Sequence, residues 1–338
     1  MKVVIAIDSF KGSLTSAEAA AAVAAGLAGH DCVVLPVSDG GEGIATVLTA
    51  ALGGRTVSAR VHDPLGREIT AEYGLIGHTA VIESAAASGL TLMSPEELDP
   101  LRASSRGTGE LIADAIRRGA RDIYVGFGGT GTNDGGAGML EAMEEVRDLW
   151  PECRFTGLCD VTATFCGPEG ATAVYGPQKG VKPEQIGWLD ERLRALAEQY
   201  RPVMGRDVLA KPGSGAAGGM AGALWAVAGG ELKPGADAVL DILRFEDRLE
   251  GASLVVTGEG RIDAQTLQGK LPAVVARRAK AFSPALRVIA FTGSLQLKSR
   301  QSLFDDIIQI TPKGTPLSVA LDPAFARARL TEAASRYR

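Results

Sequence analysis

The chain has 338 residues, of which 46% are hydrophobic and 5% aromatic, and this length favours two domains over a single core. Its net charge of −5 and the lack of a basic run argue against a nucleic-acid-binding protein, which usually needs a concentrated basic face. No stretch is long and apolar enough for a transmembrane helix, and an apolar strand starts at residue 3, so we expect neither a membrane span nor a signal peptide.

Five apolar, β-rich runs predict the strands of one sheet. Because the runs are unbroken rather than alternating, they are typical of a parallel sheet that is covered on both faces. Helical segments follow most of them, and Thr15 and Glu18 have the spacing of a capping box at the first helix. Asp322 and Pro323 predict the start of the last helix. The runs are residues 3–7, 32–37, 253–258, 287–293 and 306–311.

Two strands near the start and three near the end predict an α/β fold, a five-stranded doubly wound flavodoxin-like domain interrupted by a second mixed α/β domain. We place the first domain at residues 1–54 and 250–338 and the inserted domain at residues 55–249. The insert opens with antiparallel strands joined by turns at "DPLG" and "IGH", followed by a buried strand in "RDIYVGFGG". The active site is expected in the cleft between the two domains.

The loop "DSFKGS" (8–13) follows the first strand, at the sheet edge where doubly wound proteins bind ligands. Before a helix N-terminus, Ser9, Lys11 and Ser13 can hold a phosphate or a carboxylate, while Asp8 can bind a metal or a substrate hydroxyl. The alternative is that Ser13 and Thr15 only cap the helix and that Lys11 is solvated.

Two further polar loops follow the second and third strands. In "SDGGEG" (38–43), Asp39 and Glu42 flank Gly40 and Gly41, whose missing side chains let a ligand approach the backbone. The loop "GEGRIDAQTLQGK" (258–270) carries four charged residues, and an arginine there suits bidentate contact with phosphate, although a plain surface ion pair is the alternative. These four are Glu259, Arg261, Asp263 and Lys270.

The inserted domain supplies two more glycine-rich segments. The first, "GFGGTGTNDGGAGM" (126–139), follows a strand and places polar groups beside small ones. The second, "PGSGAAGGMAGAL" (212–224), is either a ligand loop or a site of tight packing by small residues. The candidate binding groups of the first segment are Gly128, Gly129, Thr130, Thr132, Asn133 and Asp134.

Glycine-lined loops with hydroxyls, cations and carboxylates fit phosphoryl transfer, in which cations offset phosphate charge and one or two carboxylates hold Mg²⁺. Two other functions stay open. Gly126, Gly128 and Gly131 match a dinucleotide fingerprint, which would indicate an NAD(P)-dependent oxidoreductase acting on a small hydroxy acid. A non-catalytic protein that binds a small acid is the other, although the excess of carboxylates argues against simple anion capture.

Taken in this order, the loops resemble the glycerate kinases of the bacterial type. The matching segments span nearly the whole chain and include "DSFKGSLTS", "PVSDGGEG", "SRGTGELI", "GGTGTNDGGAGM", "YGPQKG" and "TGEGRIDAQTLQGK". The resemblance implies that ATP, with Mg²⁺, phosphorylates D-glycerate, with 2-phosphoglycerate as the favoured product. A homodimer is compatible with it. About forty residues that members usually carry between "GAGMLEAM" and "CDVT" are missing here. Separately, four cysteines without C-x-x-C spacing and the lack of an export signal predict a cytoplasmic protein.

The resemblance also implies roles for the candidate residues. By this resemblance, Asp39, Glu42 and Asp263 would bind the metal. One of these acids or Asp134 would orient the acceptor hydroxyl. Arg106 and Thr108 in "SRGTGE" become a second candidate for contact with the substrate carboxylate. The cations that neutralise phosphate or the glycerate carboxylate are Lys11, Arg261 and Lys270, and the hydrogen-bond donors are Ser9, Ser13, Thr130 and Thr132.

Overall fold

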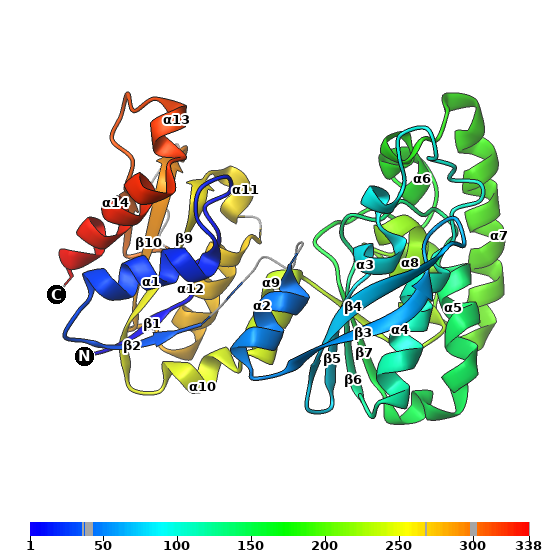
Figure 1. Cartoon of the computed structure of the whole chain (residues 1–338), viewed down its shortest axis with the longest axis horizontal. Helices are drawn as coiled ribbons and strands as arrows, with labels where there is room; N and C mark the ends of the chain where they lie inside the picture. Colours follow the sequence, from blue (N-terminus) through cyan, green and yellow to red (C-terminus); the bar gives the residue numbers. More distant parts are fainter. Residues whose placement is uncertain (36, 38–42, 268, 298–302, 338) are drawn as a thin grey trace. The chain divides into compact units, whose positions relative to one another are not determined.

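The structure is a computed structural model that describes residues 1–35, 37, 43–267, 269–297 and 303–337. The chain divides into two compact units (Figure 1). Unit 1 comprises Met1–Asp39 and Ala236–Arg338, and unit 2 comprises Gly40–Gly235. Both junctions lie about fifteen residues earlier in the chain than the predicted boundaries at 54 and 250.

Unit 1 is built on a five-stranded sheet in which every described strand pair is parallel. Its strand order is β11-β10-β9-β1-β2, so that β1 lies between β2 and β9. Counted along unit 1, this is the 2-1-3-4-5 order of flavodoxin-like folds, and the predicted fold class is confirmed. The strands are β1 (Lys2–Ile5), β2 (Asp31–Val34), β9 (Ala252–Ile262), β10 (Arg287–Leu295) and β11 (Asp306–Gln309).

Helices cover both faces of this sheet, as the unbroken apolar strands predict (Figure 1). On one face, α1 (Ser16–Gly26) and α14 (Pro323–Ser335) share a core with alternate residues of β1, β9 and β10. The predicted capping box is confirmed, since Thr15 and Glu18 cap each other's backbone N–H groups. The remaining helices are α12 (Leu271–Phe282), which packs against β9 and β10, and α9 (Gly235–Ile242), α10 (Phe245–Leu249), α11 (Ala264–Leu267) and α13 (Leu317–Ala320).

Unit 2 contains a six-stranded mixed sheet in the order β3-β4-β5-β6-β7-β8. The pairs β3–β4 and β4–β5 are antiparallel, as the turns at "DPLG" and "IGH" predict, and the other three pairs are parallel. The strands are β3 (Arg55–His62), β4 (Glu68–Ile76), β5 (Thr79–Glu83), β6 (Asp122–Gly126), β7 (Arg154–Leu158) and β8 (Glu231–Lys233).

One helix was assigned to the wrong domain. The segment "IATVLTAAL" forms α2 (Ile44–Ala51), which packs on β4 and β5 of unit 2 rather than on the sheet of unit 1. The Glu83 carboxylate receives the N–H groups of Gly43 (3.0 Å) and Ala45 (2.9 Å), and so it caps the helix that the sequence left without a capping side chain. These bonds lie within unit 2 and account for the earlier boundary.

The other helices of unit 2 surround its sheet, and one of their connections is packed unusually closely. They are α3 (Ala85–Ser88), α4 (Arg106–Arg117), α5 (Ala137–Met143), α6 (Ala171–Tyr175), α7 (Ile186–Met204) and α8 (Met220–Ala226). Ahead of α8, Gly218 has a φ of +66°, and a Cβ there would lie 2.1 Å from the Thr132 carbonyl oxygen. The small residues of "PGSGAAGGM" therefore serve tight packing, one of the two predicted readings.

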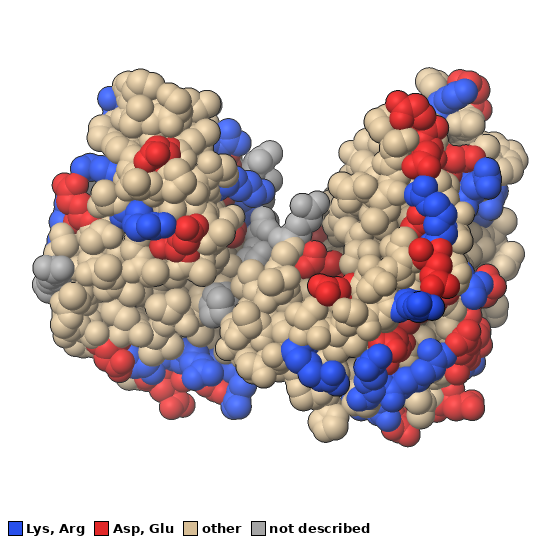
Figure 2. All heavy atoms as spheres, in the orientation of Figure 1, with Lys and Arg blue, Asp and Glu red and all other residues tan. Residues whose placement is uncertain are grey.

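The surface is mixed in charge. On the face seen in Figure 2, acidic and basic side chains occur in small interspersed groups, in keeping with 35 basic and 40 acidic residues in the chain. None of the helices in the described part of the chain has both the length and the apolar character needed to cross a bilayer.

The contact between α1 and α14 gives a prediction for the stability of unit 1. A Cβ on Gly26 would lie 2.4 Å from the Thr331 carbonyl oxygen, so Gly26→Ala must push the two helices apart and should lower the free energy of unfolding by about 1–3 kcal/mol. Urea unfolding followed by far-UV circular dichroism measures the loss. Gly187→Ala on α7 is the control, because that position is open and alanine should raise stability by up to about 1 kcal/mol. Equal effects of both changes would contradict this packing.

Candidate active site

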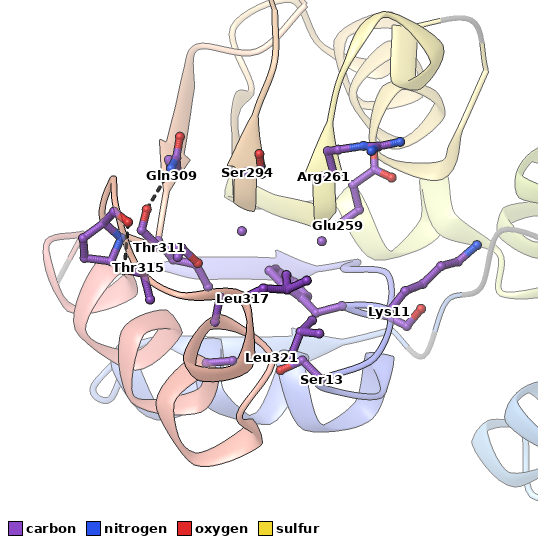
Figure 3. A pocket seen from close by; sticks show the side chains of 18 of the residues that line it. Lys11, Ser13, Glu259, Arg261, Ser294, Gln309, Thr311, Thr315, Leu317 and Leu321 are labelled. Carbon is purple, nitrogen blue, oxygen red and sulfur yellow. Dashed lines mark hydrogen bonds between the residues drawn. The ribbon is translucent and has the colours of Figure 1, made fainter.

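A hollow of about 710 Å³ lies at the carboxyl ends of β1, β9, β10 and β11 in unit 1 (Figure 3). Its volume is in the range of small-molecule sites, and its place is where doubly wound sheets bind ligands. The loops after β1 and in β9, predicted from separate parts of the sequence, come together here. The predicted residues that line it are Asp8, Ser9, Lys11, Ser13, Glu259, Arg261 and Lys270.

The loop after β1 is shaped by two apolar anchors. Phe10 and Leu14 are buried and bond to each other through the Phe10 N–H and the Leu14 carbonyl at 2.8 Å. The turn that they close leaves Lys11 exposed at its tip. Asp8 is 8% exposed, and its carboxylate receives the Ser9 N–H at 2.7 Å.

Ser13 does not cap the helix, because Thr15 holds the cap position. Its Oγ is buried and has no hydrogen-bond partner among the described residues, while its side chain lines the hollow. A buried hydroxyl without a partner costs about 1–3 kcal/mol. A ligand oxygen in the hollow would supply that partner, and the ligand role of Ser13 is therefore favoured over the capping role.

Glu259 and Lys270 form a partly buried pair at the hollow. The Glu259 carboxylate accepts the Thr266 hydroxyl at 2.6 Å and lies 3.6 Å from the Lys270 ammonium. Burial raises the pKa of Glu259, although the bond from Thr266 and the charge of Lys270 oppose that rise. The pair places the Lys270 ammonium at the hollow, where a phosphate could compete with Glu259 for it.

Arg261 and Asp263 are ion-paired, with 3.1 Å between Nε and Oδ2. The Arg261 side chain is 58% exposed, so it is accessible to a ligand, whereas Asp263 is largely buried. Asp263 also exchanges hydrogen bonds with Thr266 at the start of α11. The surface ion pair and the phosphate-binding role are thus compatible, because the guanidinium has donors for both.

Four predicted residues, Asp39, Gly40, Gly41 and Glu42, lie outside the described residues, and their roles stay predictions. Within the described part of the chain, no three His, Cys, Asp or Glu side chains are grouped so that they could hold a metal ion. The prediction that both domains share one active site also stays a prediction.

Asp134 of unit 2 is used within its own fold. One carboxylate oxygen accepts the Ser105 N–H and hydroxyl, both at 2.8 Å, and the Gly138 N–H at 3.2 Å. The other accepts the Gly136 N–H at 3.0 Å. Four internal bonds make Asp134 the group that joins the start of α5 to the start of α4, and its role as an acceptor-orienting acid stays a prediction. Its charge also occupies the helix start that a dinucleotide pyrophosphate would need.

The second candidate for contact with a substrate carboxylate is also bonded locally. Thr108 is fully buried, and its hydroxyl lies 2.7 Å from the Ser88 hydroxyl. The Arg106 guanidinium binds Glu110 at 2.8 Å and approaches Glu141 to 3.5 Å. Thr108 and Arg106 thus have partners within unit 2, and their contact with a substrate carboxylate stays a prediction.

The glycine loop after β6 has an exposed part and a buried part. Gly128 and Gly129 are exposed, so this end of the loop is accessible, whereas the neighbouring Thr130 is buried, with 6% of its surface exposed. Thr132 and Asn133 are buried, and their Oγ1 and Oδ1 atoms have no hydrogen-bond partner in the part of the chain that the structure describes.

Sequence reasoning missed Lys179, which lies beneath this loop. Lys179 is 2% exposed, and its ammonium donates to the Thr132 carbonyl at 2.8 Å. Burial lowers its pKa to about 8, although the charge of Asp134 acts in the opposite direction. In the sequence, its place in the motif "YGPQKG" was the one sign that Lys179 has a role. Its burial could not be expected, because lysines are almost never fully buried.

The fold and the hollow together define a two-unit α/β protein with a small-molecule type of site at the carboxyl edge of its parallel sheet. A family model described as "Glycerate kinase family" matches residues 3–147 and 142–337. The chain belongs to that family, as its motifs predict.

Relatives and a solved structure agree with this assignment. The "Glycerate kinase" of Bacillus subtilis (strain 168) is 39% identical, over 96% of this chain and 94% of the relative. The "Glycerate 2-kinase" of Escherichia coli (strain K12) is 42% identical, over 87% and 86%. The crystal structure of a "putative glycerate kinase 2" from Salmonella typhimurium LT2 matches with a TM-score of 0.87 and 39% identity, over 100% of this chain and 97% of that chain.

The comparisons also bear on the missing segment. The alignment with the Bacillus subtilis relative spans 360 positions, more than the 338 residues of this chain, so the relative has residues with no counterpart here. The family model matches in two parts that meet at residues 142–147. This is where the sequence pattern predicts the shortening.

Lys179 gives a pH prediction. Its pKa is about 8 when folded and about 10.5 when exposed, so between these values the unfolded chain holds more protons and stability rises with pH. The free energy of unfolding should rise by about 1–2 kcal/mol more in the wild type than in Lys179→Met between about pH 7 and about pH 9.5. Tryptophan fluorescence in urea reports unit 2, which holds Trp150, Trp188 and Trp225.

Lys182→Met is the matched control, because Lys182 is exposed and near in sequence. It should keep the pH dependence of the wild type. A Lys179→Met variant that also keeps it would show that the Lys179 ammonium is not held in a desolvated site.

Proposed function

We propose that this protein transfers the γ-phosphoryl group of ATP to D-glycerate and forms 2-phosphoglycerate. The observation that carries the proposal is the hollow of unit 1, where three cations and an unpartnered hydroxyl gather at the carboxyl edge of the sheet. Membership of the glycerate kinase family supports the reaction and the acceptor. The choice of the 2-hydroxyl rests on the name of the Escherichia coli relative.

The positively charged side chains of the hollow can offset the negative charge of the phosphoryl group that is transferred. Lys11, Arg261 and Lys270 line the same hollow, although they come from two loops far apart in the chain. Their role is to offset the phosphate charges and to hold the γ-phosphoryl group towards the acceptor. Arg261 presents a planar fork of donors, and Lys11 and Lys270 act as point charges.

Carboxylates near these cations fit a magnesium ion. Asp8 and Glu259 line the hollow with oxygen atoms, the donors that Mg²⁺ prefers, and Asp263 lies beside Arg261. Mg²⁺ usually takes one or two carboxylates and completes its shell with water and phosphate, so a preformed cluster of three acids is not required. We assign this role to Asp263 with Asp39 and Glu42, as predicted. When bound, the ion would neutralise charge between the β- and γ-phosphates.

The acceptor hydroxyl must lose a proton during transfer, and a carboxylate within hydrogen-bond reach can take it. We assign this step to an acid that follows the carboxyl end of β2 or lies in the loop after β9, namely Asp39 or Asp263. The exposed Gly128 and Gly129 of the β6 loop, with the buried Thr130 beside them, are the candidates of unit 2 for contact with the glycerate carboxylate.

The direct test is release of ADP in a coupled assay with D-glycerate, L-glycerate, glycerol and small hydroxy acids. We expect turnover with D-glycerate and magnesium, and a product whose phosphorus NMR signal is that of a phosphate at carbon 2. A protein that binds D-glycerate without consuming ATP would instead be a small-acid-binding protein. Reduction of NAD(P) with a hydroxy acid would favour the oxidoreductase.

Asp263→Asn tests the site assignment. Asparagine keeps the hydrogen bonds at the start of α11 but loses the charge, so the fold should stay intact while turnover falls by about a hundredfold or more. The control is Asp207→Asn, which changes an aspartate that caps a short helix in unit 2 and should leave turnover unchanged. Asp39→Asn should behave like Asp263→Asn. Near-normal kinetics in both Asp39 and Asp263 variants would refute the assignment.

A further inference from the structure

The hollow of unit 1 has a second end with a different chemistry. Away from Lys11 and Arg261, it is bounded by β11, the segment after it, and α13 (Figure 3). The side chains there are uncharged except for Lys313. The residues of this end that the argument uses are Ile310, Thr311, Thr315, Leu317 and Leu321.

This end exposes large apolar side chains. Leu317 is 73% exposed and Leu321 is 38% exposed, although both line the hollow. Exposed leucine surface is unfavourable in water, so a ligand that covers it binds more tightly. Figure 3 shows Leu317 and Leu321 on the same side of the hollow as Thr311 and Thr315, away from Lys11 and Arg261.

The wall of this end is held in place. Gln309 donates to the Thr311 carbonyl at 2.8 Å, and the Thr315 hydroxyl donates to the Pro312 carbonyl at 2.8 Å. The Leu321 side chain reaches the loop after β1, where a Cβ on Gly12 would lie 3.6 Å from its Cδ2. Polar and apolar ends therefore share one continuous wall, which a ligand with both characters would fill.

A nucleotide has these two characters, a charged polyphosphate and a flat apolar base. We propose that α13 and the end of β11 form the base-binding end of the hollow, with Leu317 and Leu321 against the face of the adenine. The inference rests on the proposed function, because the cation end then takes the phosphates. Among the described residues that line the hollow, Phe10 is the one aromatic residue, and it is 4% exposed, so little of its ring is open to a stacked base.

The test measures binding of ADP and of adenosine to three variants by calorimetry. Leu317→Ser removes apolar surface from the base end and should weaken both ligands by about tenfold. Val319→Ser is the matched control, because Val319 lies on the same α13 and is 41% exposed but does not line the hollow. It should bind both ligands as the wild type does.

Lys11→Gln supplies the opposite pattern. It removes a charge from the cation end, so ADP should bind about tenfold more weakly while adenosine is unaffected. In the kinase assay, Leu317→Ser should raise the KM for ATP and leave the KM for D-glycerate unchanged. Because Leu317 is mostly exposed, the variant should fold, and circular dichroism checks this.

Three results would overturn the inference. They are equal ADP affinity in Leu317→Ser and Val319→Ser, a raised KM for D-glycerate alone in Leu317→Ser, and weakened adenosine binding in Lys11→Gln. The binding measurements need no turnover, so they decide the position of the base even if the protein does not phosphorylate D-glycerate. Conversely, turnover of D-glycerate with unaltered nucleotide binding in Leu317→Ser would leave the proposed function standing and remove the base site.

Discussion

The site in unit 1 depends on one backbone hydrogen bond, from the Asp8 N–H to the Gly258 carbonyl at 2.9 Å. With the bond from the Ala6 N–H to the Val256 carbonyl, it extends the parallel pairing of β1 with β9 to three residues beyond the end of β1 and joins two loops that are far apart in the chain. Gly258 must itself lack a side chain, because a Cβ there would lie 2.1 Å from the Phe291 carbonyl oxygen. The polar groups of both loops are thereby brought to the same edge of the sheet.

The strand order explains why this edge has a hollow. Since β1 lies between β2 and β9, the chain leaves β1 towards one side and leaves β9 towards the other, and the connections diverge above the sheet. Cations then gather where the connections part, and carboxylates such as Asp8 and Glu259 lie among them. This mixture of charges suits a phosphate with its counter-ion better than a simple anion.

In unit 2 the polar groups are used differently. Asp134, Thr108 and Lys179 bond to nearby backbone or side-chain groups, and the bonds of Asp134 and Lys179 hold the glycine loop after β6. The exposed end of that loop, around Gly128 and Gly129, is open to a ligand, and Thr132 and Asn133 each keep a polar atom that has no partner among the described residues. Charged and hydroxyl residues in a glycine-rich motif can thus stabilise the loop itself instead of binding a ligand.

The sequence by itself determined the two-part α/β organisation, the helix caps at Thr15 and Asp322, and the loops that meet in unit 1, because hydrophobic period, capping and strand order are encoded locally. Only the tertiary structure decided that α2 packs in unit 2 through Glu83, that Asp134 is saturated with internal bonds, and that Lys179 is buried. It alone also brought Leu317 to the hollow. These outcomes depend on contacts between distant segments. Whether a side chain is buried or paired is decided by residues that are close in space but far away in the sequence.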